Sequence, residues 1–160
     1  MIRRFRPEDR KACEALWLEL VDWHRKLYDD ASIGPGSFAD YAEEHDVEHV
    51  WVADEEGDVI GFAGLIVYRT KAELEPVVVA ERARGRGFGR ALVDAVVGEA
   101  QRLGVARVFV RPVARNAAAI AFFHELGFTA LGHLELQLDF ERPPDYWRAG
   151  ESLAGREFRV

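Results

Sequence analysis

The stretch that decides the fold is Arg82-Ala83-Arg84-Gly85-Arg86-Gly87-Phe88-Gly89-Arg90, in which three glycines stand at alternate positions. An apolar run over 72–79 precedes it and an amphipathic run over 89–103 follows it. Glycine lets the backbone turn sharply and approach a ligand, and the first turn of a following helix presents N–H groups that lack partners in the helix. The order is therefore strand, loop, helix, and the loop suits an anion.

A phosphate group fits this loop best. The amides and the helix dipole favour it, and charge-assisted hydrogen bonds from Arg84, Arg86 and Arg90 contribute roughly 1.5–3 kcal/mol each when partly shielded. Two phosphate motifs are excluded, because the chain has no G-x-x-x-x-G-K-[ST] and Arg90 stands where G-x-G-x-x-G needs its third glycine. The alternative is that this segment is a solvated basic loop that binds no ligand.

The rest of the chain predicts an α+β, or mixed α/β, fold. Leu16, Leu20, Trp23 and Leu27 form one helical stripe, so a helix is expected over 8–27 after a short apolar start at 2–5. Segments 49–54 and 59–68 predict an antiparallel hairpin around the turn at 55–58. Further strands are expected at 72–79, 105–110 and 134–140, and further helices at 89–103 and 116–126. This order favours a mixed sheet over a uniformly parallel one.

Composition narrows the class of protein. With 160 residues and a charge of −7, we expect one soluble domain over 1–141 and a tail over 142–160, with no nucleic-acid partner. The lone Cys13 excludes an intramolecular disulfide, and the absence of a signal-like or membrane-spanning apolar run predicts a cytoplasmic protein that does not enter membranes. His45 and His49 lack the Glu of H-E-x-x-H, so we predict no metal.

The loop over 84–89 resembles the [QR]-x-x-G-x-[GA] acetyl-CoA loop of the GNAT superfamily of N-acetyltransferases, and Arg90-Ala91-Leu92 continues it. Residues 116–128, which open with Asn and close with Gly-Phe, resemble the second signature of that family. The resemblance covers about residues 2–140. It implies a GNAT-like fold with a mostly antiparallel central sheet, splayed between its fourth and fifth strands, with helices on both faces and acetyl-CoA as cosubstrate.

The resemblance also implies roles for single residues. The strand edge at Val77 and Val79 pairs with the pantetheine arm, the Val79 N–H polarises the thioester carbonyl, and Asn116 binds the pantetheine or β-alanine amides. The pyrophosphate lies on the loop, formed by Arg84, Gly85, Arg86, Gly87, Phe88, Gly89 and Arg90. From the residues themselves, Pro76 lacks an N–H and interrupts the sheet, either to open the cleft or as an ordinary edge-strand proline.

The cofactor-site position Phe123 departs from the family, because many members carry there a tyrosine that protonates the leaving sulfur. Release of the thiolate at pH 7 costs only about 2 kcal/mol if the thiol has the pKa of cysteine. Water or another side chain therefore suffices, and the tyrosines considered for this step are Tyr28, Tyr41 and Tyr146.

Acetyl transfer needs a neutral amine, hence a base. Glu73 is the first candidate and Glu75 the second, since strand alternation would place both on one face with Val77 and Val79. The alternative is that either residue is an ordinary solvent-facing strand residue. A water-mediated base would also suffice for the reaction.

The acceptor is predicted from charge. Residues 29–48 contain seven acidic residues and no Lys or Arg, which favours a cationic amine such as a polyamine, an aminoglycoside or a lysine side chain; a solvated helix face is the alternative. The apolar tail is expected to cover the acceptor site or to dock on a second subunit in a homodimer. The predicted function is direct transfer of acetyl from acetyl-CoA to a primary amine of a small molecule. The alternatives are an acyl-CoA-binding sensor or assembly module without turnover and, third, acylation of a protein or of aminoacylated tRNA.

Overall fold

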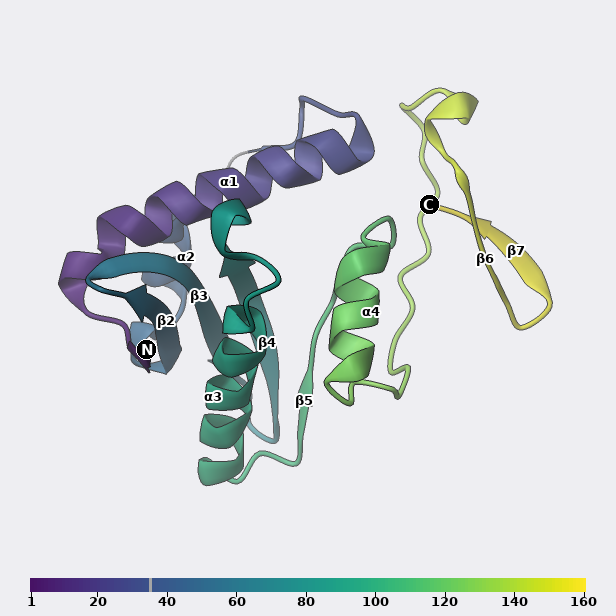
Figure 1. Ribbon diagram of the computed structural model, residues 1–160. Coiled ribbons are helices and arrows are strands. Elements are labelled where there is room, and N and C mark those ends of the chain that lie inside the picture. The colour runs from purple at the N-terminus through teal and green to yellow at the C-terminus, as the bar shows by residue number, and fades with distance from the viewer. Residues whose placement is uncertain (35) are drawn as a thin grey trace. The chain divides into compact units, whose positions relative to one another are not determined.

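The computed structural model describes residues 1–34 and 36–160, which form two compact units, Met1–Val110 and Arg111–Val160 (Figure 1). The first unit holds a five-stranded sheet in the order β1-β2-β3-β4-β5. The pairs from β1 to β4 are antiparallel, and β5 runs parallel to β4. The strands are β1 (Ile2–Arg4), β2 (Val50–Glu55), β3 (Asp58–Val67), β4 (Lys71–Val79) and β5 (Arg107–Phe109). The mixed, mostly antiparallel sheet is confirmed.

Helices cover both faces of this sheet, as neighbouring residues of β3 show. A Cβ on Gly61 would lie 3.3 Å from Leu92, whereas the Phe62 ring lies 5.3 Å from that of Phe38 and 6.5 Å from that of Trp17. Successive strand residues point to opposite faces, so α3 packs on one face and α1 and α2 on the other. The helices of this unit are α1 (Arg10–Tyr28), α2 (Phe38–Glu44) and α3 (Phe88–Arg102), with short 3-10 turns η1 (Pro7–Asp9), η2 (Val47–His49) and η3 (Glu81–Ala83).

The core lies between the sheet and these helices. Each large apolar side chain in it contributes roughly 1.5–3 kcal/mol by leaving water. The largest fully buried apolar side chains are Phe38, Phe62, Ile60, Leu65, Leu74, Leu92, Val50, Val52, Val93 and Val96. The sequence predicted α1, α3 and the strands β2 to β5 to within about two residues at each end, but it did not predict α2.

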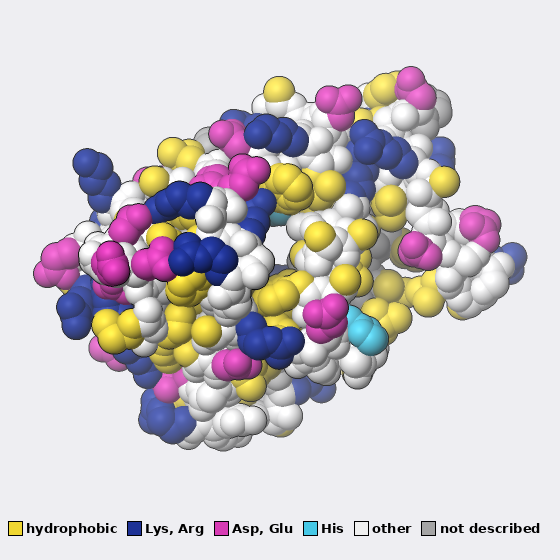
Figure 2. Space-filling view, viewed as in Figure 1, with side chains coloured by type: hydrophobic (Ala, Val, Ile, Leu, Met, Phe, Trp, Pro, Cys, Tyr) yellow, Lys and Arg dark blue, Asp and Glu magenta, His cyan; other side chains and the backbone are white. Residues whose placement is uncertain are grey.

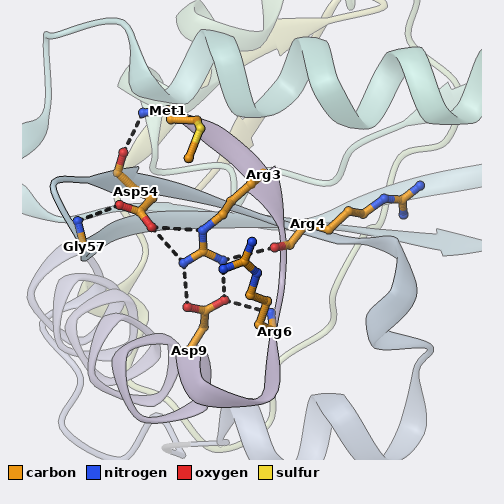
Figure 3. A network of polar contacts seen from close by, with 7 residues as sticks. All are labelled: Met1, Arg3, Arg4, Arg6, Asp9, Asp54 and Gly57. Carbon is orange, nitrogen blue, oxygen red and sulfur yellow. Dashed lines mark hydrogen bonds and ion pairs between the residues drawn. The ribbon is translucent and has the colours of Figure 1, made fainter.

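A half-buried arginine, Arg3, ties β1 to the rest of the unit (Figure 3). The Arg3 guanidinium donates to both carboxylate oxygens of Asp9 at 2.7 and 2.8 Å and to Asp54 at 2.9 Å. The hydrogen bond from Arg3 holds the pKa of Asp9 below its ordinary value, and hydrogen bonds from the Gly57 N–H and from Arg3 do the same for Asp54. One side chain thus joins β1, the turn before α1 and β2.

The second unit contains α4 (Ala117–Glu125), the turn η4 (Pro144–Tyr146) and a hairpin of β6 (Ala149–Leu153) and β7 (Arg156–Arg159). The strand predicted over 134–140 is wrong, since these residues belong to no strand, and Leu134, Leu136 and Leu138 are 58%, 70% and 79% exposed. An alternating pattern needs a partner strand, and the described residues supply none here. The hairpin in the tail was not predicted. The boundary expected at 141 stays a prediction.

Membrane crossing was also considered. Across residues 1–34 and 36–160, every helix is too short or too polar to span a bilayer.

Candidate functional site

The glycine-arginine loop leads from β4 through η3 into α3. Gly85 and Gly87 have φ of +72° and +86°, a conformation that side-chain-bearing residues rarely adopt. Gly87 is the N-cap of α3, and its carbonyl accepts the first helical bond, from the Ala91 N–H. Because glycine has no side chain with which to cap a helix, the N–H groups of the first turn, beginning at Phe88, stay available to a ligand. This is the anion-binding geometry that the sequence predicted.

Three arginines of the loop, Arg82, Arg84 and Arg86, lie close to acidic side chains. Arg86 donates two hydrogen bonds to Glu55, and Arg82 lies 2.5 Å from Asp58. On the face drawn in Figure 2, Lys and Arg side chains likewise lie interspersed with Asp and Glu. Such exposed pairs contribute at most about 1 kcal/mol each, so a diphosphate with two charges competes with them readily.

A hollow of about 440 Å³ adjoins the loop and is lined by Glu19, Glu81 and Arg82. The Glu19 carboxylate, on α1, accepts the Glu81 N–H at 2.6 Å and lies 3.8 Å from the Arg84 guanidinium. Two carboxylates repel a phosphate, so the hollow itself does not suit the diphosphate. The amides at the start of α3 suit it better.

The outer edge of β4 carries backbone groups that point away from β3. The Ala80 N–H donates to the Ile60 carbonyl, which fixes the alternation along the ladder. The N–H and C=O of Val79 and Val77 therefore point to the other edge, where Arg84 Nε donates to the Val79 carbonyl at 3.1 Å. In the described chain, β4 pairs with β5 only at Lys71–Glu73. From Leu74 onward β4 and β5 form no ladder in the described residues, so Val77 and Val79 lie beyond the paired part of this edge.

β4 carries a bulge at Glu75 and Pro76. These two residues stand opposite the single residue Gly64, since Val77 pairs with Ala63 and Leu74 with Leu65. A missing N–H at Pro76 fits a place where the ladder is interrupted. The Tyr41 hydroxyl, on α2, donates to the Glu75 carbonyl at 2.9 Å, and burial raises the pKa of Tyr41.

The bulge overturns one expectation from simple alternation. Glu73 pairs with Ile66 and Val77 with Ala63, and these two partners on β3 are three residues apart, hence on opposite faces. Glu73 therefore lies on the face of α1 and α2, whereas the side chains of Val77 and Val79 lie on the face of α3. The prediction that Glu73, Val77 and Val79 share one face is wrong, because the strand holds one residue more than a regular ladder allows.

The two candidate bases have different surroundings. Glu73 is 1% exposed and is the last residue of β4 that pairs with β5, opposite Phe109. The Tyr68 hydroxyl donates to Glu73 Oε2 at 3.2 Å. Glu75 is exposed to solvent. Glu73 thus stands where β4 and β5 part.

The distance along β4 limits which groups act together. Glu73 and Val79 are six residues apart, which is roughly 20 Å in a strand. Val77 is two residues nearer to Glu73, and its N–H points to the same edge as that of Val79. Of the two outward N–H groups, that of Val77 is therefore the nearer to Glu73 along the strand.

Tyr68 is a residue of this region that sequence reasoning missed. It ends the strand predicted over 59–68, and its N–H donates to the Lys71 carbonyl across the turn. That hairpin pairing places Tyr68 diagonally across from Glu73. A hairpin register drawn from the turn residues would have found it.

Asn116 and Phe123 belong to the second unit. The Asn116 side chain caps α4 by accepting the Ala119 N–H at 3.0 Å. Phe123 is buried, with its ring 5.1 Å from that of Phe122 and 5.8 Å from that of Phe128. Both contacts are structural, and the cofactor roles of Asn116 and Phe123 stay predictions.

Nucleophilic catalysis by Cys13 and the binding of a metal ion were also considered. Burial raises the pKa of Cys13 to about 12, which makes its thiol a poor nucleophile at neutral pH. In the part of the chain that the structure describes, no three His, Cys, Asp or Glu side chains gather where they could hold a metal ion.

The sequence that forms this Gly-capped helix after a bulged strand also matches the model of a known protein family. The model for the acetyltransferase (GNAT) family matches residues 10–128, and the chain belongs to this family. Its fold is the GNAT fold. The protein Rv2747 of Mycobacterium tuberculosis, solved in complex with CoA, superposes with a TM-score of 0.65 at 27% identity, over 86% of this chain and 76% of that one.

Relatives with assigned activities have similar sequence identity. The chain is 29% identical to a mycothiol acetyltransferase of Corynebacterium glutamicum over 132 residues, which are 77% of this chain and 44% of that protein. It is also 29% identical to a D-amino-acid N-acetyltransferase of Saccharomyces cerevisiae, over 68% of this chain and 72% of that protein. The chain thus spans less than half of the mycothiol acetyltransferase.

Proposed function

We propose that the protein is an acetyl-CoA-dependent N-acetyltransferase that moves an acetyl group directly to a primary amine of a cationic small molecule. The observation that carries the proposal is the stretch of β4 beyond its pairing with β5, which leads from Glu73 past the outward N–H groups of Val77 and Val79 to the amides at Gly87. An extended cofactor with a diphosphate at one end and a thioester at the other matches this arrangement.

In the proposed reaction, the loop amides hold the diphosphate, and the pantetheine arm lies along the edge at Val77 and Val79. For this arm to bind, Arg84 must leave the Val79 carbonyl that it occupies. The N–H at Val79 or, nearer to the base, at Val77 stabilises the oxygen that becomes negative when the amine attacks. Glu73 is the proposed base.

The cationic acceptor rests on the acidic residues between 29 and 48. Several are exposed, including Asp40, Glu43 and Glu44, whereas Asp30 and Asp46 accept local backbone N–H groups. The exposed members favour a cation by long-range attraction, which salt weakens. Binding of a cationic acceptor should therefore weaken as salt is raised.

The experiment is release of free CoA thiol from acetyl-CoA in the presence of a panel of amines. Turnover with primary alkylamines, highest for those with several positive charges, supports the proposal. Preference for neutral or anionic amines contradicts the cationic acceptor but leaves acetyl transfer intact. The tail and the homodimer predicted for it are tested separately, by the molar mass of the protein in solution.

A CoA-binding sensor or assembly module without turnover is the second candidate. Phe123 favours it, because this ring offers no hydroxyl to protonate a thiolate. Calorimetric binding of CoA, together with no thiol release across the whole panel, would establish the sensor in place of the enzyme.

A further inference from the structure

The face of the sheet beside the β3–β4 turn holds four side chains with a common orientation. Glu73 pairs with Ile66 on one side and with Phe109 on the other, and Tyr68 pairs with Lys71 through the turn. Paired residues share a face, and so do residues two apart on a strand. Tyr68, Lys71, Glu73 and Phe109 therefore all lie on the face of α1 and α2.

Burial separates the carboxylate from solvent. Glu73 is 1% exposed, so an amine arriving from solvent does not reach its carboxylate without displacing a neighbour. Tyr68 is 41% exposed, and its hydroxyl lies 3.2 Å from Glu73 Oε2. Tyr68 thus reaches the molecular surface and also contacts the buried carboxylate through its hydroxyl.

We infer that Tyr68 is a catalytic residue, the group that meets the acceptor amine and passes its proton to Glu73. The inference rests on the proposed function and names the path by which the buried base acts. In the step, a protonated amine gives one N–H proton to the Tyr68 oxygen while the Tyr68 hydroxyl proton moves to the Glu73 carboxylate. The products are a neutral amine, an intact tyrosine and a protonated Glu73, so atoms and charge balance.

The neighbouring rings support the same place for the amine. Tyr68 and Phe109 stack with ring centroids 6.2 Å apart, and the Lys71 ammonium lies 5.1 Å over the Phe109 ring and 5.8 Å over the Tyr68 ring. A primary ammonium is attracted to the negative faces of aromatic rings. The rings thus already contact one ammonium group, and an acceptor amine would take this place by displacing the Lys71 side chain.

The test compares wild type with Tyr68→Phe, which keeps the ring and removes the hydroxyl. Two acceptors are used: an alkylamine with a pKa of about 10, like that of lysine, and a weakly basic amine that is already neutral at the assay pH. We expect kcat/KM for the alkylamine to fall about tenfold to hundredfold, with little change for the neutral amine. An equal loss with both acceptors, or no loss, overturns the inference, because a merely structural tyrosine does not distinguish them.

A double variant tests the path itself. If Tyr68 acts through Glu73, Tyr68→Phe has no further effect on alkylamine turnover once Glu73→Gln is present. Losses that multiply contradict the relay. Calorimetry with CoA shows that each variant still folds and binds. If wild type acetylates no amine at all, the proposed function fails and takes the relay with it; if wild type turns over, only the relay is at stake.

Discussion

The Tyr41 hydroxyl donates a 2.9 Å hydrogen bond to the carbonyl of Glu75, at the bulge of β4. This contact joins α2 to the one place where the ladder between β3 and β4 is interrupted. The bulge in turn decides that Glu73 faces α1 and α2 while Val77 and Val79 face α3. Tyr41 thus helps to hold the arrangement on which the proposed site depends.

Tyr41→Phe removes this donor and leaves the ring in the core. We expect the free energy of unfolding to fall by about 1 kcal/mol, because a partly buried hydrogen bond to the Glu75 carbonyl is lost. Urea denaturation measures this loss. The KM for acetyl-CoA should rise as the edge of β4 loosens, and an unchanged KM would show that the bulge holds its shape without the tyrosine.

Gly64→Ala tests the space around the same contact. A Cβ at Gly64 would lie 2.2 Å from the Tyr41 hydroxyl oxygen and 2.6 Å from the Glu75 carbonyl oxygen. We expect a loss of about 3 kcal/mol in unfolding free energy, measured in urea. Gly98→Ala is the control, because that position within α3 has open space, and alanine there should stabilise the helix by about 0.5–1 kcal/mol.

Gly87→Val should weaken the binding of CoA. Valine tolerates φ of +86° poorly, so the N-cap of α3 moves and its amides lose their aim at the diphosphate. We expect CoA affinity in calorimetry to fall at least about tenfold, equivalent to 1.4 kcal/mol. Gly104→Val carries a similar backbone penalty, at φ +71°, just beyond the other end of α3. Equal loss of CoA affinity in both variants would mean that general destabilisation explains the result.

Glu73→Gln should lower kcat for an alkylamine by about 10²–10⁴-fold, as expected for loss of a general base. Glu75→Gln should change kcat by less than about threefold, since the Glu75 side chain is exposed and its carbonyl, not its carboxylate, makes the contact with Tyr41. Steady-state kinetics at saturating acetyl-CoA separate the two. The reverse order of effects would make Glu75 the base.

Acid stability is predicted from Glu99, a buried residue of α3. Hydrogen bonds from Arg102 and Arg4 lower the pKa of Glu99 to about 2. A lowered pKa means that the stabilising contribution is complete at neutral pH and disappears as the pH falls from about 4 toward 2. Glu99→Gln should therefore lower the unfolding free energy by about 1–2 kcal/mol at pH 7 and by much less near pH 2. A difference independent of pH would contradict this.

The sequence predicted most elements of the first unit because these elements carry their own periodicity, but it did not predict the short helix α2. The stripe that includes Leu16 and Leu20 marks α1, and the glycines before Phe88 mark the start of α3. The loop motif predicted the turn into α3 for a local reason, since positive φ is a property of a few adjacent residues, and the anion site at this turn stays a prediction.

Tertiary features were less visible. The bulge at Glu75 depends on the partner strand as much as on β4 itself, so counting alternate residues placed Val77 on the wrong face. The leucines over 134–140 alternate as a strand would, yet a strand also needs a neighbour with which to form hydrogen bonds. The hairpin of β6 and β7 turns at Ala154 and Gly155, which both have positive φ. In the sequence, Gly155 was a local sign of this turn.

The extra residue in β4 adds length to the strand without moving Glu73 to another face. Deleting either Glu75 or Pro76 would leave one residue opposite Gly64 and restore a regular ladder, in which Glu73 still pairs with Ile66 and Val77 with Ala63. Such a deletion would therefore straighten the strand while keeping the side chains of the ladder in their layers, which separates the shape of the strand from the placement of the carboxylate.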